Sequence, residues 1–273
     1  MSPEFEDDLG TPLALPADGV RRVVSLVPSL TESVAVTAPG LLVGATDWCT
    51  HPADLDVVRV RGTKNPAVER VVALRPDVVL ANEEENRVAD LAALRAAGLA
   101  VWVTAPRTVP AGLVSLRRML AGLGLGRPTW LAAAESAWAP SYVGPRRRAL
   151  VPIWRRPWMA LGRDTFAGDL LARLGVDNVC AADESRYPTV DLASVRRNGV
   201  DLVVLPDEPY AFSPTDGPET FADWGAAVAH VSGRHLTWYG PSLAEARLVL
   251  AAQLDAASLP VGPTEEPAET LEA

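Results

Sequence analysis

The chain is poor in the residues that build disulfide frameworks and metal centres. Among its 273 residues there are only two cysteines and three histidines. Two isolated cysteines, Cys49 and Cys180, do not make a disulfide framework, so they leave the redox compartment undecided. The G-x-S-x-G, P-loop and H-E-x-x-H motifs are missing as well, so no familiar catalytic motif supports an enzyme and no cofactor is expected.

The chain also lacks an excess of positive charge and any long apolar run. Its formal net charge is −9, which argues against nucleic acid and anionic membrane surfaces as main partners. No apolar run approaches the ~18–20 residues of a membrane span. The segment 1–10 has neither the basic nor the apolar part of a signal peptide. We therefore expect no membrane insertion and, as written, a cytoplasmic protein.

What the chain does have is a regular alternation of short apolar strands and amphipathic helices. Hydrophobic residues make up 48% of the sequence, enough for one large domain or two lobes with cores of their own. The alternation predicts an α/β fold with mainly parallel sheets covered on both faces. At 29–32, Ser-Leu-Thr-Glu fits a capping box that would open a helix.

The most informative stretch runs from Val71 to Arg87. It reads as the end of a helix, a turn at Pro76, a buried strand at 78–80 and an acidic loop at 82–86. In open α/β sheets, ligands bind at the carboxyl ends of the strands. We therefore expect the acidic loop, with Glu83 and Glu84, to lie at a binding edge.

A second copy of this pattern occurs later in the chain at one fixed separation. The matched pairs are Val71 and Val195, Asp77 and Asp201, Val79 and Val203, and Glu84 and Glu208. At the same separation, Leu-Val-Pro at 26–28 matches Leu-Val-Pro at 150–152. These matches predict two similar lobes that arose by duplication. A segment at 154–165, rich in tryptophan and arginine, has no counterpart in the first lobe.

The predicted organisation has five parts. They are a disordered acidic tail (1–19), an N-terminal α/β lobe (20–107), a helical connector (108–148), a C-terminal α/β lobe (149–258) and a disordered acidic tail (259–273). A ligand cleft is expected between the two lobes.

Large aromatic side chains gather in segments that the pattern assigns to loops: Trp48, Trp154, Trp158, Tyr187, Tyr210, Phe212 and Trp238. Because large rings normally belong on strands and helices, we predict that the set stacks on a flat ligand, while packing stays the alternative for any one ring. Charged residues are predicted to meet the ligand's polar rim, or else to be simply solvated: Lys64, Glu83, Glu84, Arg163 and Glu208. Ser29, at a helix amino end, is either a further ligand contact or an ordinary cap.

Cys49 and His51 form a C-x-H pair, and a thiolate and an imidazole both bind soft metals. No second pair at zinc spacing accompanies them, so the signal is weak. One alternative function is a metal-dependent hydrolase that uses Cys49, His51 and Glu84 within the Glu83–Glu85 run. Another is a diverged scaffold that binds a partner protein.

Several stretches carry a resemblance to a known family: VVSLVPSLTES, VGATDWCTHP, RGTKNPAVERVVALRPDVVLANEEENR, VPIWRRPWMALGRDTFAGDLLARLGVDNV and VVLPDEPYAF. Over roughly residues 20–255 the chain resembles the class III, helical-backbone substrate-binding proteins of ABC importers for cobalamin, haem and ferric siderophores. The resemblance implies non-catalytic binding of a cobalamin-like tetrapyrrole or other metal chelate in a shallow cleft, with little hinge motion.

The same resemblance implies an ABC permease as partner and an extracytoplasmic location for the relatives. In the family, one surface carboxylate on each lobe pairs with arginines of the permease. Glu69 matches the first carboxylate, while Ala193 stands at the second position, with Asp191 only nearby. The identity of the ligand, the existence of a cognate permease and the oligomeric state stay open.

Overall fold

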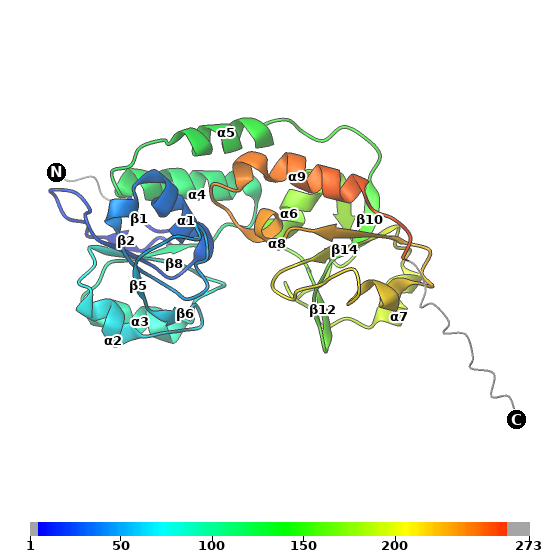
Figure 1. The fold of residues 1–273 in the computed structure, drawn as a ribbon, viewed down its shortest axis with the longest axis horizontal. Helices are drawn as coiled ribbons and strands as arrows, with labels where there is room; N and C mark the ends of the chain where they lie inside the picture. The colour runs from blue at the N-terminus through cyan, green and yellow to red at the C-terminus, as the bar shows by residue number, and fades with distance from the viewer. Residues whose placement is uncertain (1–4, 261–273) are drawn as a thin grey trace, which may run out of the picture. The chain divides into compact units, whose positions relative to one another are not determined.

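The computed structural model describes residues 5–260 of the chain, which form two compact units (Figure 1). Of the described residues, the first unit comprises 5–141 together with Thr237–Arg247, and the second comprises Tyr142–Leu236 and 248–260. Within the described residues no helix has both the length and the apolar character needed to cross a membrane.

The first unit is built on a five-stranded sheet in the order β5-β4-β3-β8-β9, with every pair parallel. The strands are β3 (Val23–Ser25), β4 (Leu42–Ala45), β5 (Val58–Arg59), β8 (Val78–Asn82) and β9 (Val101–Thr104). The helices between them are α1 (Pro28–Thr37), the 3-10 turn η1 (Pro39–Leu41), α2 (Val68–Ala73) and α3 (Val88–Ala96). Two short antiparallel ribbons complete it: β1 (Phe5–Glu6) with β2 (Pro12–Leu13), and β6 (Arg61–Gly62) with β7 (Asn65–Pro66).

Two longer helices follow β9 and belong to the first unit. They are α4 (Val109–Gly122), capped by Thr108, and α5 (Thr129–Trp138). The Trp138 indole donates to the carbonyl of Leu243, at the start of α9 (Leu243–Asp255), at 2.9 Å. Most of the predicted connector therefore packs with the first unit, and the boundary between the units lies inside it.

The second unit has a four-stranded parallel sheet in the order β13-β10-β14-β15. Its strands are β10 (Arg147–Leu150), β13 (Val176–Asn178), β14 (Leu202–Pro206) and β15 (Ala227–Val231). Its helices are α6 (Phe166–Ala172), α7 (Leu192–Arg197), the 3-10 turn η2 (Pro218–Phe221) and α8 (Gly233–Thr237). The predicted insertion forms an antiparallel ribbon, β11 (Pro152–Arg155) and β12 (Trp158–Ala160). The predicted α/β class, with two similar units and parallel sheets, is confirmed.

The repeat is visible in the elements, but one of its sequence matches is wrong. The α2–β8 pair recurs as α7–β14 at one separation, as predicted. Val24 pairs with Val79, however, just as Leu150 pairs with Val203. The counterpart of Leu150 is thus Val24 and not Leu26. The two Leu-Val-Pro stretches lie in different elements, since one leads into a helix and the other into the β11–β12 ribbon.

The two units differ in the segment that connects their last two strands in the chain, β8 to β9 in the first unit and β14 to β15 in the second. In the first unit α3 lies between β8 and β9 in the chain, and its Leu91 and Leu94 enter the core. Between β14 and β15 the described chain forms a loop with only the short η2 turn. Phe212 and Phe221 of this segment are buried in the core of the second unit. Aromatic rings therefore occupy a place that helical leucines fill in the first unit.

The prediction of a disordered amino-terminal tail is wrong for residues 5–19. Asp7 is 1% exposed, and its Oδ1 accepts hydrogen bonds from the backbone N–H groups of Leu9 and Thr11 at 2.9 and 2.8 Å. Its Oδ2 accepts from Arg95 at 3.3 Å. An acidic, proline-containing composition suggested disorder, but these hydrogen bonds to the buried Asp7 carboxylate order the segment. Residues 1–4, and residues 261–273 of the predicted carboxyl-terminal tail, lie outside the described residues.

The predicted capping box at 29–32 is also wrong. The residue that caps α1 is Val27, and Pro28 occupies the first helical turn. Proline suits this position because its fixed φ angle is helical and its missing N–H has no intrahelical acceptor there. Ser29 is therefore inside the helix, where it is 2% exposed and its hydroxyl has no partner among the described residues.

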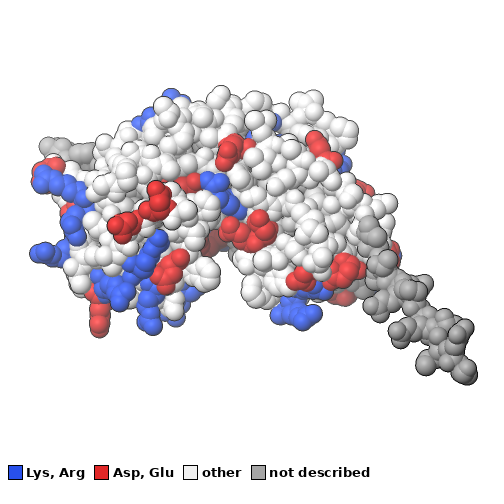
Figure 2. All heavy atoms as spheres, viewed as in Figure 1, with Lys and Arg blue, Asp and Glu red and all other residues white. Residues whose placement is uncertain are grey.

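Charged side chains of both signs are interspersed on the face of the molecule shown in Figure 2. Ion pairs between such side chains occur in the described residues, for example Arg118 with Asp8 at 2.7 Å. This face has no continuous basic stripe of the kind that marks nucleic-acid-binding proteins.

Replacement of Asp7 by alanine should lower the free energy of unfolding by about 2–4 kcal/mol, because the partly buried N–H groups of Leu9 and Thr11, the buried N–H of Val103 and Arg95 lose their acceptor. Urea denaturation measures the change. Glu6→Ala, on an exposed neighbour, should change the stability by less than about 0.5 kcal/mol. Equal effects of the two substitutions would show that residues 5–19 do not contribute to the fold as described.

Candidate functional site

The acidic loop after β8 is held rigid by two asparagine side chains. The Oδ1 atom of Asn82 accepts hydrogen bonds from the backbone N–H groups of Glu84 and Glu85 at 2.8 and 3.1 Å. Asn86 closes the loop, since its Oδ1 accepts from the Asn82 N–H at 2.8 Å and its Nδ2 donates to the Thr63 carbonyl at 2.9 Å. These bonds satisfy the backbone locally, as asparagine does in tight turns, and leave the glutamate side chains available for other contacts.

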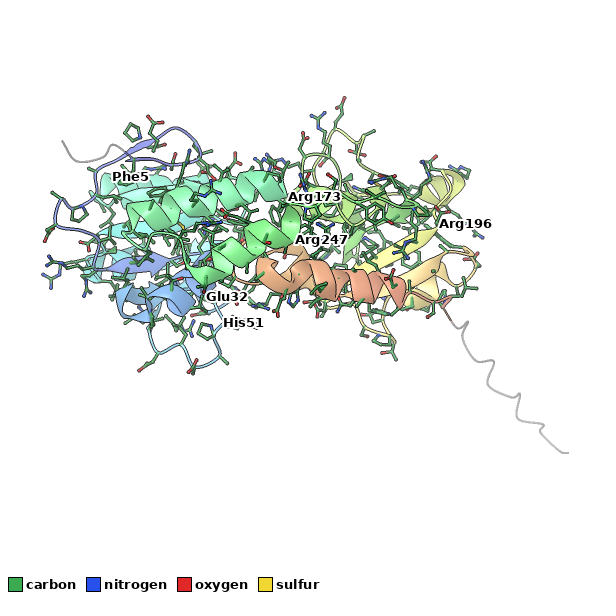
Figure 3. The ribbon with its side chains drawn as sticks, turned by 90° about the horizontal axis from the view of Figure 1, so that it is seen from above. Phe5, Glu32, His51, Arg173, Arg196 and Arg247 are labelled. Carbon is green, nitrogen blue, oxygen red and sulfur yellow. The ribbon has the colours of Figure 1, made fainter. Side chains whose placement is uncertain are left out.

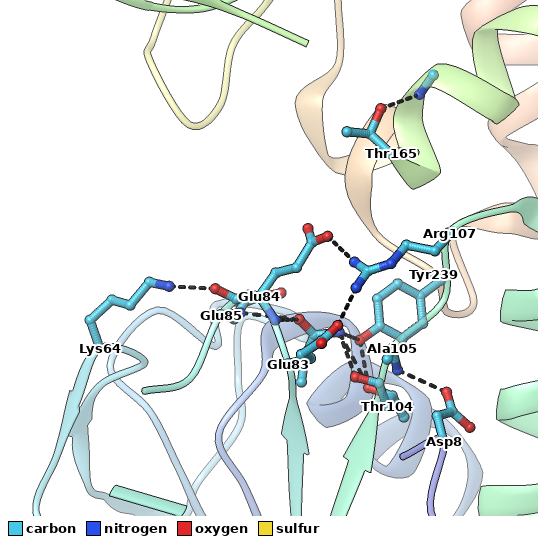
Figure 4. Close-up of polar contacts among 12 residues, drawn as sticks. Asp8, Lys64, Glu83, Glu84, Glu85, Thr104, Ala105, Arg107, Thr165 and Tyr239 are labelled. Atoms are coloured by element: carbon cyan, nitrogen blue, oxygen red, sulfur yellow. Dashed lines mark hydrogen bonds and ion pairs between the residues drawn. The ribbon is translucent and has the colours of Figure 1, made fainter. Parts of the chain in front are cut away.

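The two glutamates that were predicted to meet a ligand are both ion-paired to Arg107 (Figure 4). Lys64 donates to the backbone carbonyl of Glu84. The three side chains of the Arg107 cluster are 27–37% exposed, so each pair contributes only about 0–1 kcal/mol to stability. The cluster is thus a partly neutralised, solvent-accessible group at the carboxyl ends of β8 and β9. Sequence reasoning missed Arg107, although its place just after a strand was a usable signal.

Behind this cluster lies a buried hydrogen-bonded chain centred on Tyr239. Its hydroxyl accepts from Asn82 Nδ2 at 2.7 Å and lies 2.8 Å from Thr104 Oγ1. Thr104 in turn donates to the Ala81 carbonyl at 3.0 Å. Burial raises the pKa of Tyr239 far above its ordinary value, so the phenol stays protonated and can act as a donor. Tyr239 comes from the segment Thr237–Arg247 and fastens it to the ends of β8 and β9.

The loop after β4 separates the two predicted metal ligands. Cys49 is fully buried, and its sulfur lies 3.0 Å from Thr31 Oγ1 and 3.1 Å from Thr46 Oγ1. Burial raises the pKa of its thiol, which opposes the thiolate form that binds metals. His51 is exposed and contacts the ring of Trp238 edge-on, with centroids 5.4 Å apart. Within residues 5–260, no three histidine, cysteine or acidic side chains gather into a metal-binding group.

Trp48 precedes this pair and is the most exposed of the aromatic residues predicted to stack on a ligand, at 68%. A Cβ atom placed on Gly62 would lie 3.3 Å from the Trp48 Nε1 atom. The indole therefore lies beside the β6–β7 ribbon with most of its surface in solvent. Trp238, in contrast, is 8% exposed.

In the second unit, aromatic residues predicted in loops belong largely to the packed interior. Trp154 and Trp158 lie on the β11–β12 ribbon and not in a loop. The Trp158 ring stacks on Phe212 with centroids 6.0 Å apart and planes 5° from parallel. Phe212 is 4% exposed, so the packing alternative holds for this ring. The physical reason is the missing helix between β14 and β15, which leaves room that the rings fill.

Two rings at the edge of this cluster are less enclosed. Trp154 is 44% exposed and meets Tyr210 edge-on, with centroids 5.6 Å apart. The Tyr210 hydroxyl donates to Asp216 at 2.6 Å. Arg155 is ion-paired to Asp216 and Glu219, and its guanidinium lies over the Trp158 ring, 5.6 Å from the centroid. Trp154 thus presents an oriented ring to solvent.

A similar contact occurs at the carboxyl end of β14, where an acidic residue after one strand binds the segment after the next strand. Asp207 Oδ1 accepts from the Gly233 N–H at 2.6 Å. A Cβ atom on Gly233 would lie 2.7 Å from the Cγ and backbone N of Glu208. His235 Nδ1 lies 2.9 Å from Ser232 Oγ. In each unit, acidic residues after one strand therefore hold the segment that follows the next strand. The predicted ligand contact of Glu208 stays a prediction, and the sequence analysis did not single out Ser232 or His235.

The remaining predicted contacts are scattered. Arg163 is exposed and 3.8 Å from Asp164, and Tyr187 is half-buried, with its backbone N–H donating to Ser185 Oγ at 3.2 Å. Glu69 is exposed in the first turn of α2. Their predicted roles stay predictions.

At the position of α7 that matches Glu69 stands Ala193. The nearby Asp191 accepts hydrogen bonds from the N–H groups of Ala193 and Ser194, both at 3.2 Å, and from the Ser194 hydroxyl at 2.6 Å. Asp191 is thus the amino-terminal cap of α7. Its carboxylate is already engaged in hydrogen bonds to the first turn of this helix.

The substitution Tyr239→Phe should lower the free energy of unfolding by about 1–3 kcal/mol, because Asn82 and Thr104 lose a buried partner. Chemical denaturation followed by fluorescence checks the value. Tyr142→Phe is a control with an exposed hydroxyl and should cost less than about 1 kcal/mol. An equally stable Tyr239→Phe protein would contradict the fastening role.

The Cys49 thiol should resist labelling by a disulfide reagent in the folded protein. In the Cys180→Ser variant at pH 8, we expect no reaction until urea is added, because burial both shields the sulfur and keeps it protonated where an ordinary thiol, of pKa about 8.5, begins to ionise. The Cys49→Ser variant, which retains the half-buried Cys180, should react measurably without urea. Rapid labelling of native Cys49 would contradict its burial.

No family model matches the chain. Among known proteins, a vitamin B12-binding protein of Yersinia pestis (strain Pestoides F) is 24% identical over 250 residues, which are 88% of this chain and 87% of that protein. An uncharacterised ABC transporter substrate-binding lipoprotein of Bacillus subtilis is 41% identical over 64 residues, which are 23% of this chain but only 20% of that protein.

Solved structures extend the likeness to the fold. The periplasmic vitamin B12-binding protein of Vibrio cholerae superposes with a TM-score of 0.71 at 19% identity, covering 87% of this chain and 97% of that one. A periplasmic haem-binding protein from Roseiflexus gives a TM-score of 0.72 at 20% identity, covering 86% and 98%. With its two parallel-sheet units, this chain therefore has the fold of the class III substrate-binding proteins that its sequence resembles.

Proposed function

We propose that this protein binds a cobalamin-like tetrapyrrole or another metal chelate without changing it chemically, as a relative of ABC-importer substrate-binding proteins. The observation that carries the proposal is a fold shared over more than four-fifths of the chain with proteins that bind vitamin B12 and haem. The vitamin B12-binding relative from Yersinia pestis supports it along nearly the same length of sequence.

The chemistry of the strand ends is consistent with such a ligand. Exposed indoles at Trp48 and Trp154 offer apolar faces to a flat macrocycle. The Arg107 cluster and Lys64 place charged and hydrogen-bonding groups at the carboxyl edge of the first sheet. Polar groups of this kind orient a ligand, while apolar rings provide contact area.

The alternative of a metal-dependent hydrolase has little support. It requires a Cys49 thiolate next to His51, but the thiol is buried among hydroxyl groups. Glu84, its third member, is ion-paired to Arg107. A protein-binding scaffold is the outcome to which a failed ligand test would point.

We also propose that contact with a permease, if one is present, relies on Glu69. This carboxylate is exposed on α2, whereas the matching helix of the second unit offers only Ala193 and the engaged Asp191. The solved relatives are described as periplasmic. The location of this protein stays a prediction.

Thermal unfolding in the presence of cyanocobalamin, cobinamide, haem and several ferric siderophores tests the proposal. A ligand at a hundred times its dissociation constant should add about 2.7 kcal/mol to the free energy of unfolding. Trp48→Ala should reduce the shift, and Val88→Ala, on an exposed residue of α3, should leave it unchanged. If no ligand shifts the transition, the scaffold interpretation replaces the proposal, and stoichiometric metal found by elemental analysis would instead revive the metal site.

A further inference from the structure

We infer that Asn198 is a site of self-modification, at which the backbone nitrogen of Gly199 converts the asparagine side chain to aspartate or isoaspartate. The reaction needs an asparagine that water reaches, a following residue that leaves the approach open, and a backbone N–H that can lose its proton. The turn that joins α7 to β14 provides all three. The inference is independent of the ligand proposed above.

Gly199 leaves the approach to the Asn198 side chain open. Both residues are exposed. A Cβ atom on Gly199 would meet nothing within 4 Å, and its φ angle of +73° is one that glycine adopts without steric cost. The hydrogen bonds that Asn198 makes within residues 5–260 use only its backbone N–H and carbonyl. Its side-chain amide can therefore turn toward the next backbone nitrogen.

The other four of the five asparagines in the chain each lack one of these conditions. Asn65 is exposed, but it precedes Pro66, whose backbone nitrogen carries no hydrogen. The remaining three precede residues with large side chains, and their own amide groups are engaged in hydrogen bonds: Asn82, Asn86 and Asn178. Asn198 is thus the asparagine at which the reaction is expected.

Arg148 of β10 acts directly on the reacting peptide group. Its Nη2 donates to the Asn198 carbonyl at 2.8 Å, and its Nε donates to the Gly199 carbonyl at 3.0 Å. The Asn198 carbonyl and the Gly199 nitrogen belong to one peptide group, so a cation at that oxygen draws electron density from the nitrogen. Because nearby positive charge favours an anionic form, the Gly199 N–H loses its proton more readily than an ordinary peptide N–H.

One hydrogen bond must open before the nitrogen can react. The Gly199 N–H donates to the Arg196 carbonyl at 3.2 Å. This bond lies at the carboxyl end of α7, a helix of six residues, and helix ends fray. Figure 3 shows Arg196 at the outside of the second unit. Opening the bond is therefore a local event that leaves the core of the unit intact.

The reaction balances without an oxidant, a metal or a cofactor. The Gly199 nitrogen gives up its proton and forms a bond to Cγ of Asn198, and the side-chain nitrogen takes up a proton and leaves as ammonia. The product is a cyclic imide. Water then adds to one of the two imide carbonyls and breaks the C–N bond of that carbonyl. Attack at one carbonyl gives aspartate, and attack at the other gives isoaspartate, whose backbone runs through the former side chain.

The modification changes both the charge and the backbone of the turn. It adds a negative charge to a chain whose formal net charge is already −9. The new carboxylate follows the last turn of α7, which carries Arg196 and Arg197. Cations of this kind offset the unfavourable position of an anion at the carboxyl end of a helix.

Incubation of the full-length protein at pH 8, followed by peptide mapping with mass spectrometry, tests the inference. We expect aspartate and isoaspartate to accumulate at position 198 and the rate to rise with pH, because the reacting nitrogen must lose its proton. Asn65 is the exposed control and should stay intact. Asn198→Ser should prevent the acidic form of the protein that ion-exchange chromatography resolves.

Two arginine variants test the part played by Arg148. Arg148→Met should slow the conversion severalfold, because the Asn198 carbonyl loses its cation. Arg197→Met is the matched control, since this neighbouring guanidinium donates to the Ser194 hydroxyl at 2.7 Å and not to the reacting peptide group. It should leave the rate unchanged. Far-ultraviolet circular dichroism confirms that both variants are folded.

A synthetic peptide of residues 194–203 shows how fast the same sequence reacts without the fold. If position 198 of the protein stays intact after this peptide has been fully converted, the inference is wrong. If position 198 is converted at the same rate in the unmodified protein and in Arg148→Met, the activation by Arg148 is wrong and the modification site stands.

Discussion

Every strand of the two main sheets runs parallel to its neighbours, and the rest of the structure follows from this constraint. Parallel strands need crossover connections, so helices cover the faces and all carboxyl ends meet at one edge of each sheet. The backbone groups at that edge have no further strand to bond to. Side chains satisfy them instead, as Asn82 does after β8 and Asp207 does after β14. The edge is therefore polar and ordered.

Two kinds of polar contact occur at this edge of the first sheet, and they differ in how much they stabilise the fold. Glu83 and Glu84 are ion-paired to Arg107, so they are not simply solvated. Partly exposed ion pairs are weak, so each of these pairs contributes little to stability. The buried Tyr239 contact behind them is different, because a lost partner there leaves buried groups unsatisfied. The buried hydrogen bonds of Tyr239 therefore contribute more to stability than the partly exposed ion pairs of Arg107.

The sequence pattern did not predict which aromatic rings are exposed and which are buried. Trp48, Trp158 and Phe212 looked alike as rings outside regular elements. The structure leaves Trp48 largely in solvent, while Trp158 stacks on the buried Phe212. The difference arises because the second unit has a loop where the first has α3, so its rings complete the core. Nothing local to the sequence around Phe212 signals that a helix is missing from the opposite unit.

The sequence by itself determined the α/β class, the recurrence of one helix–strand pattern in two units and the acidic strand ends, because these depend on periodicity and on residues close together in the chain. It misjudged the segment 5–19, whose order depends on contacts of Asp7 with Arg95 and β9. Only the tertiary structure decided that Arg107 joins Glu83 and Glu84, that Tyr239 bonds to Asn82, and that Cys49 is buried while His51 is exposed. Each of these depends on packing between segments distant in sequence, or on which side of a loop faces the core, and neither leaves a periodic trace.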